Sequence, residues 1–137
     1  MNLVRGTATD GAVVAGDLTF PRSGVPVQDV VVGIRPECLT PADDGRPALE
    51  LRVEVVEPLG EQVVVHGTVA GTPVHSGAEE EGAEIPMLVE GARAPMTAIF
   101  AADREPAPGD ILRLGVLPER IHLFDQRSGD AIAGATR

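Results

Sequence analysis

The sequence contains no Trp, no Tyr and no Lys, and these absences already exclude several kinds of protein. Three Phe are the only aromatic residues, so the chain has almost no rings on which bases or sugars could stack, and its core must be aliphatic. All eleven basic residues are Arg. The absence of Lys excludes a phosphate-loop lysine, a Schiff base and a Ser-Lys dyad.

Positive charge and cysteine are also scarce, and this limits the partners and the compartment. The 21 acidic residues outnumber the 11 basic ones, and the resulting net charge of −10 repels nucleic acids and anionic lipids. The single cysteine, Cys38, cannot form an internal disulfide, which fits a reducing compartment. The sequence has neither an apolar stretch of about 18 residues nor the apolar core of a signal peptide. We therefore expect a soluble, intracellular protein that binds no nucleic acid.

The residues that are present predict β-strands. The 16 Gly and 12 Pro are spread along the chain and leave little room for helices. Apolar residues alternate with polar ones in residues 49–55, which places Leu49, Leu51, Val53 and Val55 on one face of a strand. The alternation breaks at residues 56–58, which predicts a bulge or a strand end. Further strands are expected at residues 29–34, 62–69, 96–101, 110–117 and 121–124.

The turn residues between these runs predict how the strands are connected. Gly60 lies between two alternating runs and indicates a hairpin, and Pro108–Gly109 suits a type II turn. Pro36 favours one short helical turn at residues 36–39. Residues 76–95 carry five Glu and one Arg and are expected to form an inserted, solvated acidic loop. Residues 1–137 are therefore expected to be a single all-β domain, a small barrel or sandwich with at most one short helix, and no internal repeat is evident.

No arrangement of residues in the sequence indicates catalysis or metal binding. The candidate metal ligands have no short pairing of the kind that metal sites use, so independent, hydrogen-bonded histidines are favoured; these candidates are Cys38, His66, His75 and His122. Each Ser stands beside Gly in a turn-like setting, outside any nucleophile elbow. The paired acidic residues are typical of a solvated surface. We expect no catalytic, cofactor-binding or metal-binding residue in this chain.

Two stretches resemble the C-terminal domain of the ATP-binding subunits of carbohydrate importers. These are residues 33–39 (Gly-Ile-Arg-Pro-Glu-Cys-Leu) and residues 55–60 (Val-Val-Glu-Pro-Leu-Gly). The similarity continues at residues 108–110 (Pro-Gly-Asp) and 122–125 (His-Leu-Phe-Asp), and Met1-Asn2 resembles the residues with which the ATPase domain of such subunits ends. The residues that carry this resemblance, with a structural or interface role, are Gly33, Arg35, Pro36, Glu37, Glu57, Gly60, His122, Phe124 and Asp125.

The resemblance implies a transport-associated oligonucleotide/oligosaccharide-binding (TOBE) fold, an OB-type β-barrel that serves as a regulatory and dimerisation domain. The chain would then be a fragment of a larger ATPase subunit at the inner face of the cell membrane, with ATP and Mg²⁺ bound by the ATPase domain that it lacks. The implied partners are a second copy of the subunit, the importer's membrane subunits and a regulatory protein.

One residue and one stretch depart from the family pattern, and an alternative function stays open. Cys38 stands where the family commonly has His, and the acidic stretch at residues 76–95 is longer than usual. We expect Arg35 to be held against the barrel by the carboxylate of Asp125 or Glu37. The alternative function is that of a related barrel that binds a small oxyanion such as molybdate, which the missing Lys and the negative charge disfavour.

Overall fold

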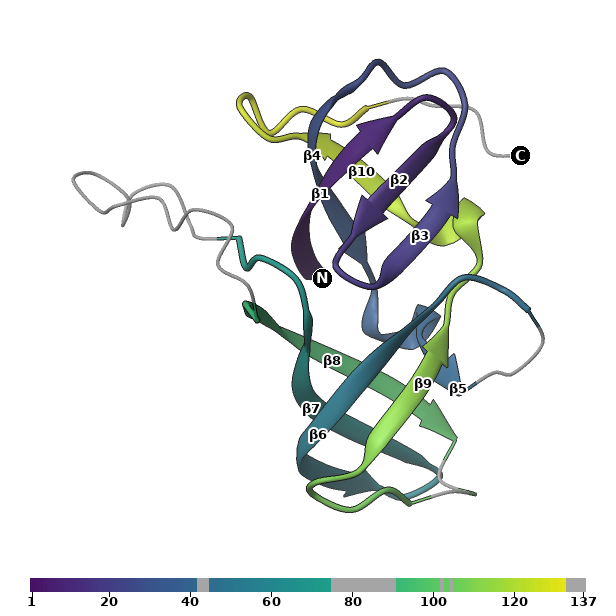
Figure 1. The fold of residues 1–137 in the computed structure, drawn as a ribbon. Helices are drawn as coiled ribbons and strands as arrows, with labels where there is room; N and C mark the ends of the chain where they lie inside the picture. Colours follow the sequence, from purple (N-terminus) through teal and green to yellow (C-terminus); the bar gives the residue numbers. More distant parts are fainter. Residues whose placement is uncertain (42–44, 75–90, 102, 104, 133–137) are drawn as a thin grey trace.

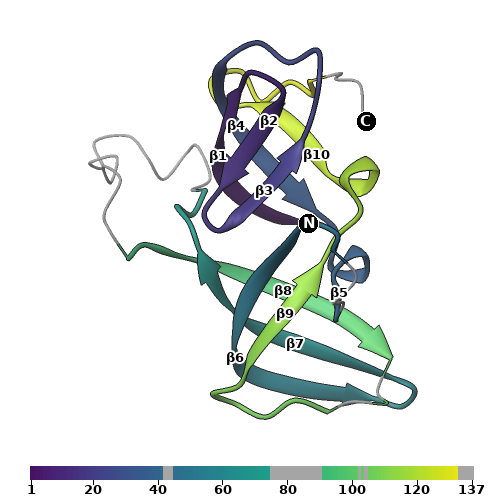
Figure 2. The same cartoon turned by 45° about the vertical axis from the view of Figure 1, so that its right-hand side comes forward.

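The described residues form ten strands in two antiparallel sheets. The computed structural model describes residues 1–41, 45–74, 91–101, 103 and 105–132, and this part of the chain contains no α-helix. Sheet 1 has the strand order β10-β4-β1-β2-β3, and sheet 2 has the order β5-β9-β6-β7-β8. The two sheets lie one above the other in Figures 1 and 2, with the N-terminus near their junction. The prediction of an all-β, OB-type fold is confirmed.

The strand bounds follow the alternation of buried and exposed residues along the chain. Sheet 1 consists of β1 (Asn2–Thr9), β2 (Ala12–Ala15), β3 (Leu18–Pro21), β4 (Gln28–Ile34) and β10 (His122–Asp125). Sheet 2 consists of β5 (Thr40–Pro41), β6 (Ala48–Leu59), β7 (Gln62–Ala70), β8 (Arg93–Ala101) and β9 (Ile111–Gly115). The sequence did not predict four of these strands, namely β1, β2, β3 and β5. It did predict β6, but that strand is longer than expected.

Two similar turns carry the chain between the sheets. The chain leaves sheet 1 through the 3-10 turn η1 (Pro36–Cys38) and returns from sheet 2 through the 3-10 turn η3 (Pro118–Arg120). The first turn is the one that the sequence predicts, and the second was missed. The two turns have similar sequences: Gly-Ile-Arg-Pro-Glu-Cys-Leu in residues 33–39 and Gly-Val-Leu-Pro-Glu-Arg-Ile in residues 115–121.

This repeated pattern, which the sequence reading overlooked, has a physical basis. In each copy the proline stands at the start of the turn, where its missing N–H costs nothing. The apolar residues on either side are buried in both copies: Ile34 and Leu39 in the first, Val116 and Ile121 in the second. Each crossing is therefore anchored in the core at both ends.

The bulge in strand β6 lies nearer the start of the strand than the sequence predicts. The pairing of β6 with β7 shifts between Val53 and Val55, which places a bulge at Glu54, and β6 then continues through Pro58 to Leu59. Because the bulge inserts one residue, it moves Val55 to the solvent face, where the side chain is 52 % exposed. The expectation that Val55 shares the buried face of Leu49, Leu51 and Val53 is therefore wrong. Pro58 is tolerated because β9 pairs with β6 only as far as Arg52.

The turn predictions are confirmed. Gly60 has φ +65° and is the first of the two residues that connect Leu59 to Gln62, as in a type II′ hairpin. Gly109 has φ +95°, and the N–H of Asp110 donates to the carbonyl of Ala107 at 3.0 Å, which closes the predicted turn. Most of the expected acidic loop, residues 76–90, lies outside the described residues. Its last three residues, 93–95, belong to β8 and are therefore not part of a loop.

The core is aliphatic, as the composition requires. Among its fully buried large side chains are Leu18, Ile34, Leu39, Leu51 and Leu114, and Phe20 is the largest. Both sheets contribute to this single cluster, which Cys38 also contacts from a half-buried position. The core therefore joins the two sheets in one packing unit.

Candidate functional site

The residues that carry the family resemblance fall into separate groups. Gly33, His122 and Phe124 lie together in sheet 1, where His122 pairs with Gly33 and Phe124 pairs with Val31. A Cβ atom at Gly33 would lie 2.6 Å from Sδ of Met1 and 3.0 Å from Cε2 of Phe124. Glycine therefore leaves room for Met1 and Phe124 to pack over strand β4, and a larger residue would displace the flexible Met1 side chain. His122 is exposed.

Arg35 and Glu37 do not form the ion pair that the sequence suggested. Both side chains are exposed, and within the described residues Arg35 makes no ion pair. The backbone of Arg35 is extended (φ −72°, ψ 143°), as expected before Pro36, but the buried neighbour on this strand end is Ile34. The expectation that Asp125 or Glu37 holds Arg35 against the barrel is therefore wrong.

Asp125 organises a turn instead of binding Arg35. Its Oδ1 atom accepts hydrogen bonds from the backbone N–H groups of Arg127, at 2.8 Å, and Ser128, at 3.2 Å. This is the local pairing that Asp favours at the start of a turn. The chain then returns alongside β10, where the N–H of Asp125 donates to the carbonyl of Asp130 at 2.8 Å.

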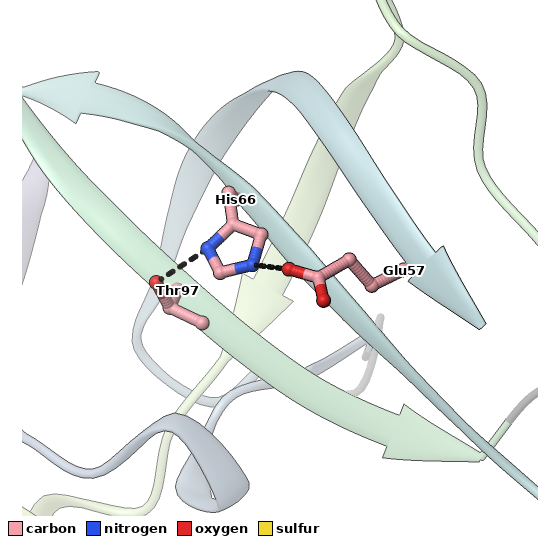
Figure 3. A network of polar contacts seen from close by, with 3 residues as sticks. All are labelled: Glu57, His66 and Thr97. Atoms are coloured by element: carbon pink, nitrogen blue, oxygen red, sulfur yellow. Dashed lines mark hydrogen bonds and ion pairs between the residues drawn. The ribbon is translucent and has the colours of Figure 1, made fainter. Parts of the chain in front are cut away.

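Glu57 belongs to a polar row that crosses three strands of sheet 2 (Figure 3). His66 on β7 contacts Oε1 of Glu57 through Nε2 at 2.6 Å and Oγ1 of Thr97 through Nδ1 at 3.2 Å. The register explains the row, because His66 pairs with Thr97 on β8 and is diagonal to Glu57 on β6. The side chains of His66 and Glu57 are 38 % and 56 % exposed, so water screens their interaction.

The row continues into sheet 1 through Asn2, the only asparagine of the chain. The Nδ2 group of Asn2 donates to the carbonyl of Thr97 at 2.7 Å, and its Oδ1 accepts from the N–H of Thr97 at 2.9 Å. The carboxamide thus pairs with edge strand β8 as another strand would. Asn2 is only 9 % exposed. In the sequence, Met1-Asn2 belongs to the family resemblance, and no local pattern predicts this link.

Arg22 is the buried arginine of the described chain, and the sequence reading missed it. Its side chain is 6 % exposed and lies over the ring of Phe20, 5.6 Å from the ring centroid. The Nη2 group donates to the carbonyls of Pro118, at 2.8 Å, and Ile121, at 3.0 Å, and so caps both ends of turn η3. Burial lowers the pKa of the Arg22 guanidinium. Nothing near Arg22 in the sequence indicates this role, because its partners lie about a hundred residues away.

A cleft of about 510 Å³ opens where sheet 1 meets the segment after β7. Arg5 and Thr7 of β1, Asp29 of β4 and Thr72 provide polar groups, and much of the remaining wall is Gly or Ala. The sheets meet closely here: the N–H of Arg5 donates to the carbonyl of Thr72 at 3.0 Å. None of these residues was a candidate in the sequence analysis.

The described residues offer little for other chemistry. Among them, no group of three His, Cys, Asp or Glu side chains is placed to hold a metal ion, and His75 lies outside this part of the chain. No helix within the described ranges is long and apolar enough to cross a membrane.

Comparison with known proteins relates this chain to transport proteins. Residues 32–84 match the family model described as the TOBE domain. The chain is 34 % identical over 103 residues to a sulfoquinovosyl glycerol transport ATP-binding protein of Agrobacterium fabrum, an alignment that covers 75 % of this chain and 23 % of the relative. It is 32 % identical over 127 residues to an sn-glycerol-3-phosphate import ATP-binding protein of a Ruegeria species, covering 93 % of this chain and 28 % of the relative.

A third relative has the same coverage pattern. The chain is 30 % identical over 132 residues to a putative ATP-binding protein of Brucella abortus, and the alignment covers 94 % of this chain and 31 % of that protein. The chain therefore spans only about a quarter to a third of the length of these curated relatives.

Proposed function

Because this chain belongs to the TOBE-domain family, we propose that it is the regulatory and dimerisation domain of the ATP-binding subunit of an ABC importer. The observation that carries the proposal is the coverage of the alignments. Nearly the whole chain aligns with about a third of proteins that are named ATP-binding. In this proposal ATP hydrolysis, with ATP and Mg²⁺, belongs to another domain of the longer subunit, and the present chain carries no catalytic residue.

The names of the relatives indicate the class of cargo. One relative is named for sulfoquinovosyl glycerol transport and another for sn-glycerol-3-phosphate import. We therefore propose an importer of sugars or glycerol phosphates. The subunit would lie in the cytoplasm at the inner face of the membrane, in contact with the importer's membrane subunits through its ATPase domain. A regulatory protein that binds this domain is a further proposed partner.

The outer face of sheet 2 is the surface that we propose for contact between two subunits. Val55 and Leu59 project from β6 with 52 % and 58 % of their surface exposed. The half-buried Val64 and Ile99 lie on the same face of β7 and β8, where Val64 pairs with Ile99, and Glu57 stands opposite Val64, between Val55 and Leu59. We call the four apolar residues the sheet 2 patch. A small patch of this kind suits an interface that depends on further contacts elsewhere in the subunit.

Sedimentation of the full-length subunit with ATP tests this surface. We expect Val55→Asp and Leu59→Asp to raise the dimer dissociation constant at least about tenfold, because each buries a charge in an apolar contact. Val27→Asp is the matched control, since Val27 is 72 % exposed and lies outside the sheet 2 patch. A full-length subunit that stays monomeric with ATP would contradict the proposed function. Equal effects of all three variants would contradict the proposed surface.

A further inference from the structure

The cleft beside β1 contains one cation and one carboxylate that do not pair with each other. Arg5 and Thr7 lie two residues apart on β1, and Asp29 on β4 pairs in register with Thr7. Within the described part of the chain, Arg5 and Asp29 make no ion pair with each other or with any other residue. Two opposite charges therefore line one cleft without an ion-pair partner among the described residues.

The guanidinium of Arg5 is incompletely satisfied. Its Nε atom is buried and has no hydrogen-bond partner. A buried donor without a partner costs free energy, and the Nη groups of the same guanidinium can still pair with an anion. The net charge of −10 repels an anion from most of the surface, so its pairing with Arg5 must outweigh that repulsion.

The walls of the cleft leave room for a ligand. Six of the twelve lining residues are Gly or Ala, namely Gly6, Gly16, Ala70, Gly71, Gly91 and Ala92. Their small side chains leave a volume of about 510 Å³, within the range that small-molecule sites occupy. The remaining polar lining is neutral and comes from Thr7, Thr72 and Gln126.

We propose that this cleft binds a small organic anion that also carries hydroxyl groups. The carboxylate or phosphate of the ligand pairs with the guanidinium of Arg5, which matches such groups in a bidentate geometry. Asp29 accepts hydrogen bonds from the ligand's hydroxyl groups, and the threonines and Gln126 bind the remaining hydroxyls. An anion without hydroxyl groups gains nothing from Asp29 and is repelled by it. This site is independent of the proposed dimer contact, which lies on sheet 2.

Calorimetric titration of the 137-residue chain tests the site with four probes. D-Gluconate and glucose 6-phosphate carry the two possible acidic groups, glucose carries none, and inorganic phosphate lacks the hydroxylated carbon chain. We expect one or both sugar acids to bind at least about tenfold more tightly than glucose and inorganic phosphate, since a hydrogen bond to a charged group contributes about that factor. The sugar acid that binds more tightly shows whether the site prefers a carboxylate or a phosphate. Equal binding of all four probes, or no heat up to millimolar concentrations, would overturn the proposal.

Variants separate the site from general electrostatic attraction. Arg5→Gln should weaken sugar-acid binding at least about tenfold, whereas Arg113→Gln removes the same charge from an exposed position on β9 and should change it less than about twofold. Asp29→Asn should tighten the binding of inorganic phosphate. Equal losses in both arginine variants would overturn the proposal.

Backbone chemical shifts provide a readout that needs no variant. On titration with the sugar acid, the largest amide shifts should fall on Gly6, Thr7, Gly71 and Thr72, which line the cleft. Shifts that gather elsewhere on the chain would place the ligand outside the cleft and overturn the assignment, even if Arg5→Gln fails to fold.

Discussion

Replacing Asn2 tests how the two sheets are held together. The carboxamide of Asn2 makes two hydrogen bonds to the backbone of Thr97, one as donor and one as acceptor, at 2.7 and 2.9 Å. Asn2→Ala removes both. Asn2→Asp keeps nearly the same shape and can still accept from the N–H of Thr97, but it cannot donate to the carbonyl, and its charge would face that oxygen.

The expected loss follows from burial. A hydrogen bond contributes about 1 kcal/mol net, and a buried group left without a partner costs about 1–3 kcal/mol. Water can reach part of the exposed edge of β8 once the side chain is truncated, so we expect Asn2→Ala to lower the free energy of unfolding by about 2 kcal/mol. Asn2→Asp should lose at least as much, because the repulsion at the carbonyl offsets the bond that it keeps.

Urea unfolding and amide hydrogen exchange measure this effect. Exchange is the more specific assay, because the N–H of Thr97 should be protected in the native chain and should lose that protection in Asn2→Ala. Asp17→Ala is the control: Asp17 also joins the sheets, by accepting from the N–H of Glu50, but that bond is exposed and 3.3 Å long. The control should lose less than about 0.5 kcal/mol. If Asn2→Ala is as stable as the control and Thr97 stays protected, the carboxamide does not join the sheets.

Three further predictions concern stability. Arg22→Gln should lower the free energy of unfolding by about 2–3 kcal/mol in urea titrations, because the carbonyls of Pro118 and Ile121 lose a charged donor; a loss below about 0.5 kcal/mol would contradict the capping role. Gly16→Ala should lower the free energy of unfolding by about 3 kcal/mol, since its Cβ would lie 1.9 Å from the carbonyl oxygen of Ala70. Gly109→Ala is the control: Gly109 also has a positive φ but open space around it, so the loss should be about 1 kcal/mol. Equal melting temperatures of the two variants would refute the close approach at Gly16. A double-mutant cycle on Glu57→Gln and His66→Gln should give a coupling free energy below about 1 kcal/mol, because both side chains are substantially exposed. A larger value would contradict the screening of this pair by water.

The sequence predicts strands well where large aliphatic residues alternate with polar ones. Residues 62–69 were identified in this way and correspond to β7, whereas residues 29–34 were identified as a short run of Val and Ile and correspond to β4. Strands β1 and β2 were missed because their inward positions include Gly6, Ala8 and Ala15, which bury too little apolar surface to stand out in a hydrophobic pattern. The phase of β6 was wrong beyond Glu54, since a bulge depends on the pairing of two strands and leaves no distinct signal in one of them.

The arginines show why the polar contacts could not be predicted in the same way. The motif drew attention to Arg35, which is exposed, while the buried arginine is Arg22, whose partners Pro118 and Ile121 lie on turn η3. Asn2 and Thr97 are equally distant in sequence, and the cleft around Arg5 combines residues of β1, β2 and β4 with the segments at 70–72 and 91–92. Local patterns report which residues face the core. They do not report which side chains meet across the two sheets.

The most direct test of the proposed function is the effect of this domain on the pairing of the whole subunit. Sedimentation equilibrium would compare the full-length ATP-binding subunit with a version that lacks the present 137 residues, both with ATP. We predict that removal of the domain raises the dimer dissociation constant at least about tenfold, a loss of about 1.4 kcal/mol. An unchanged dissociation constant would contradict the dimerisation role.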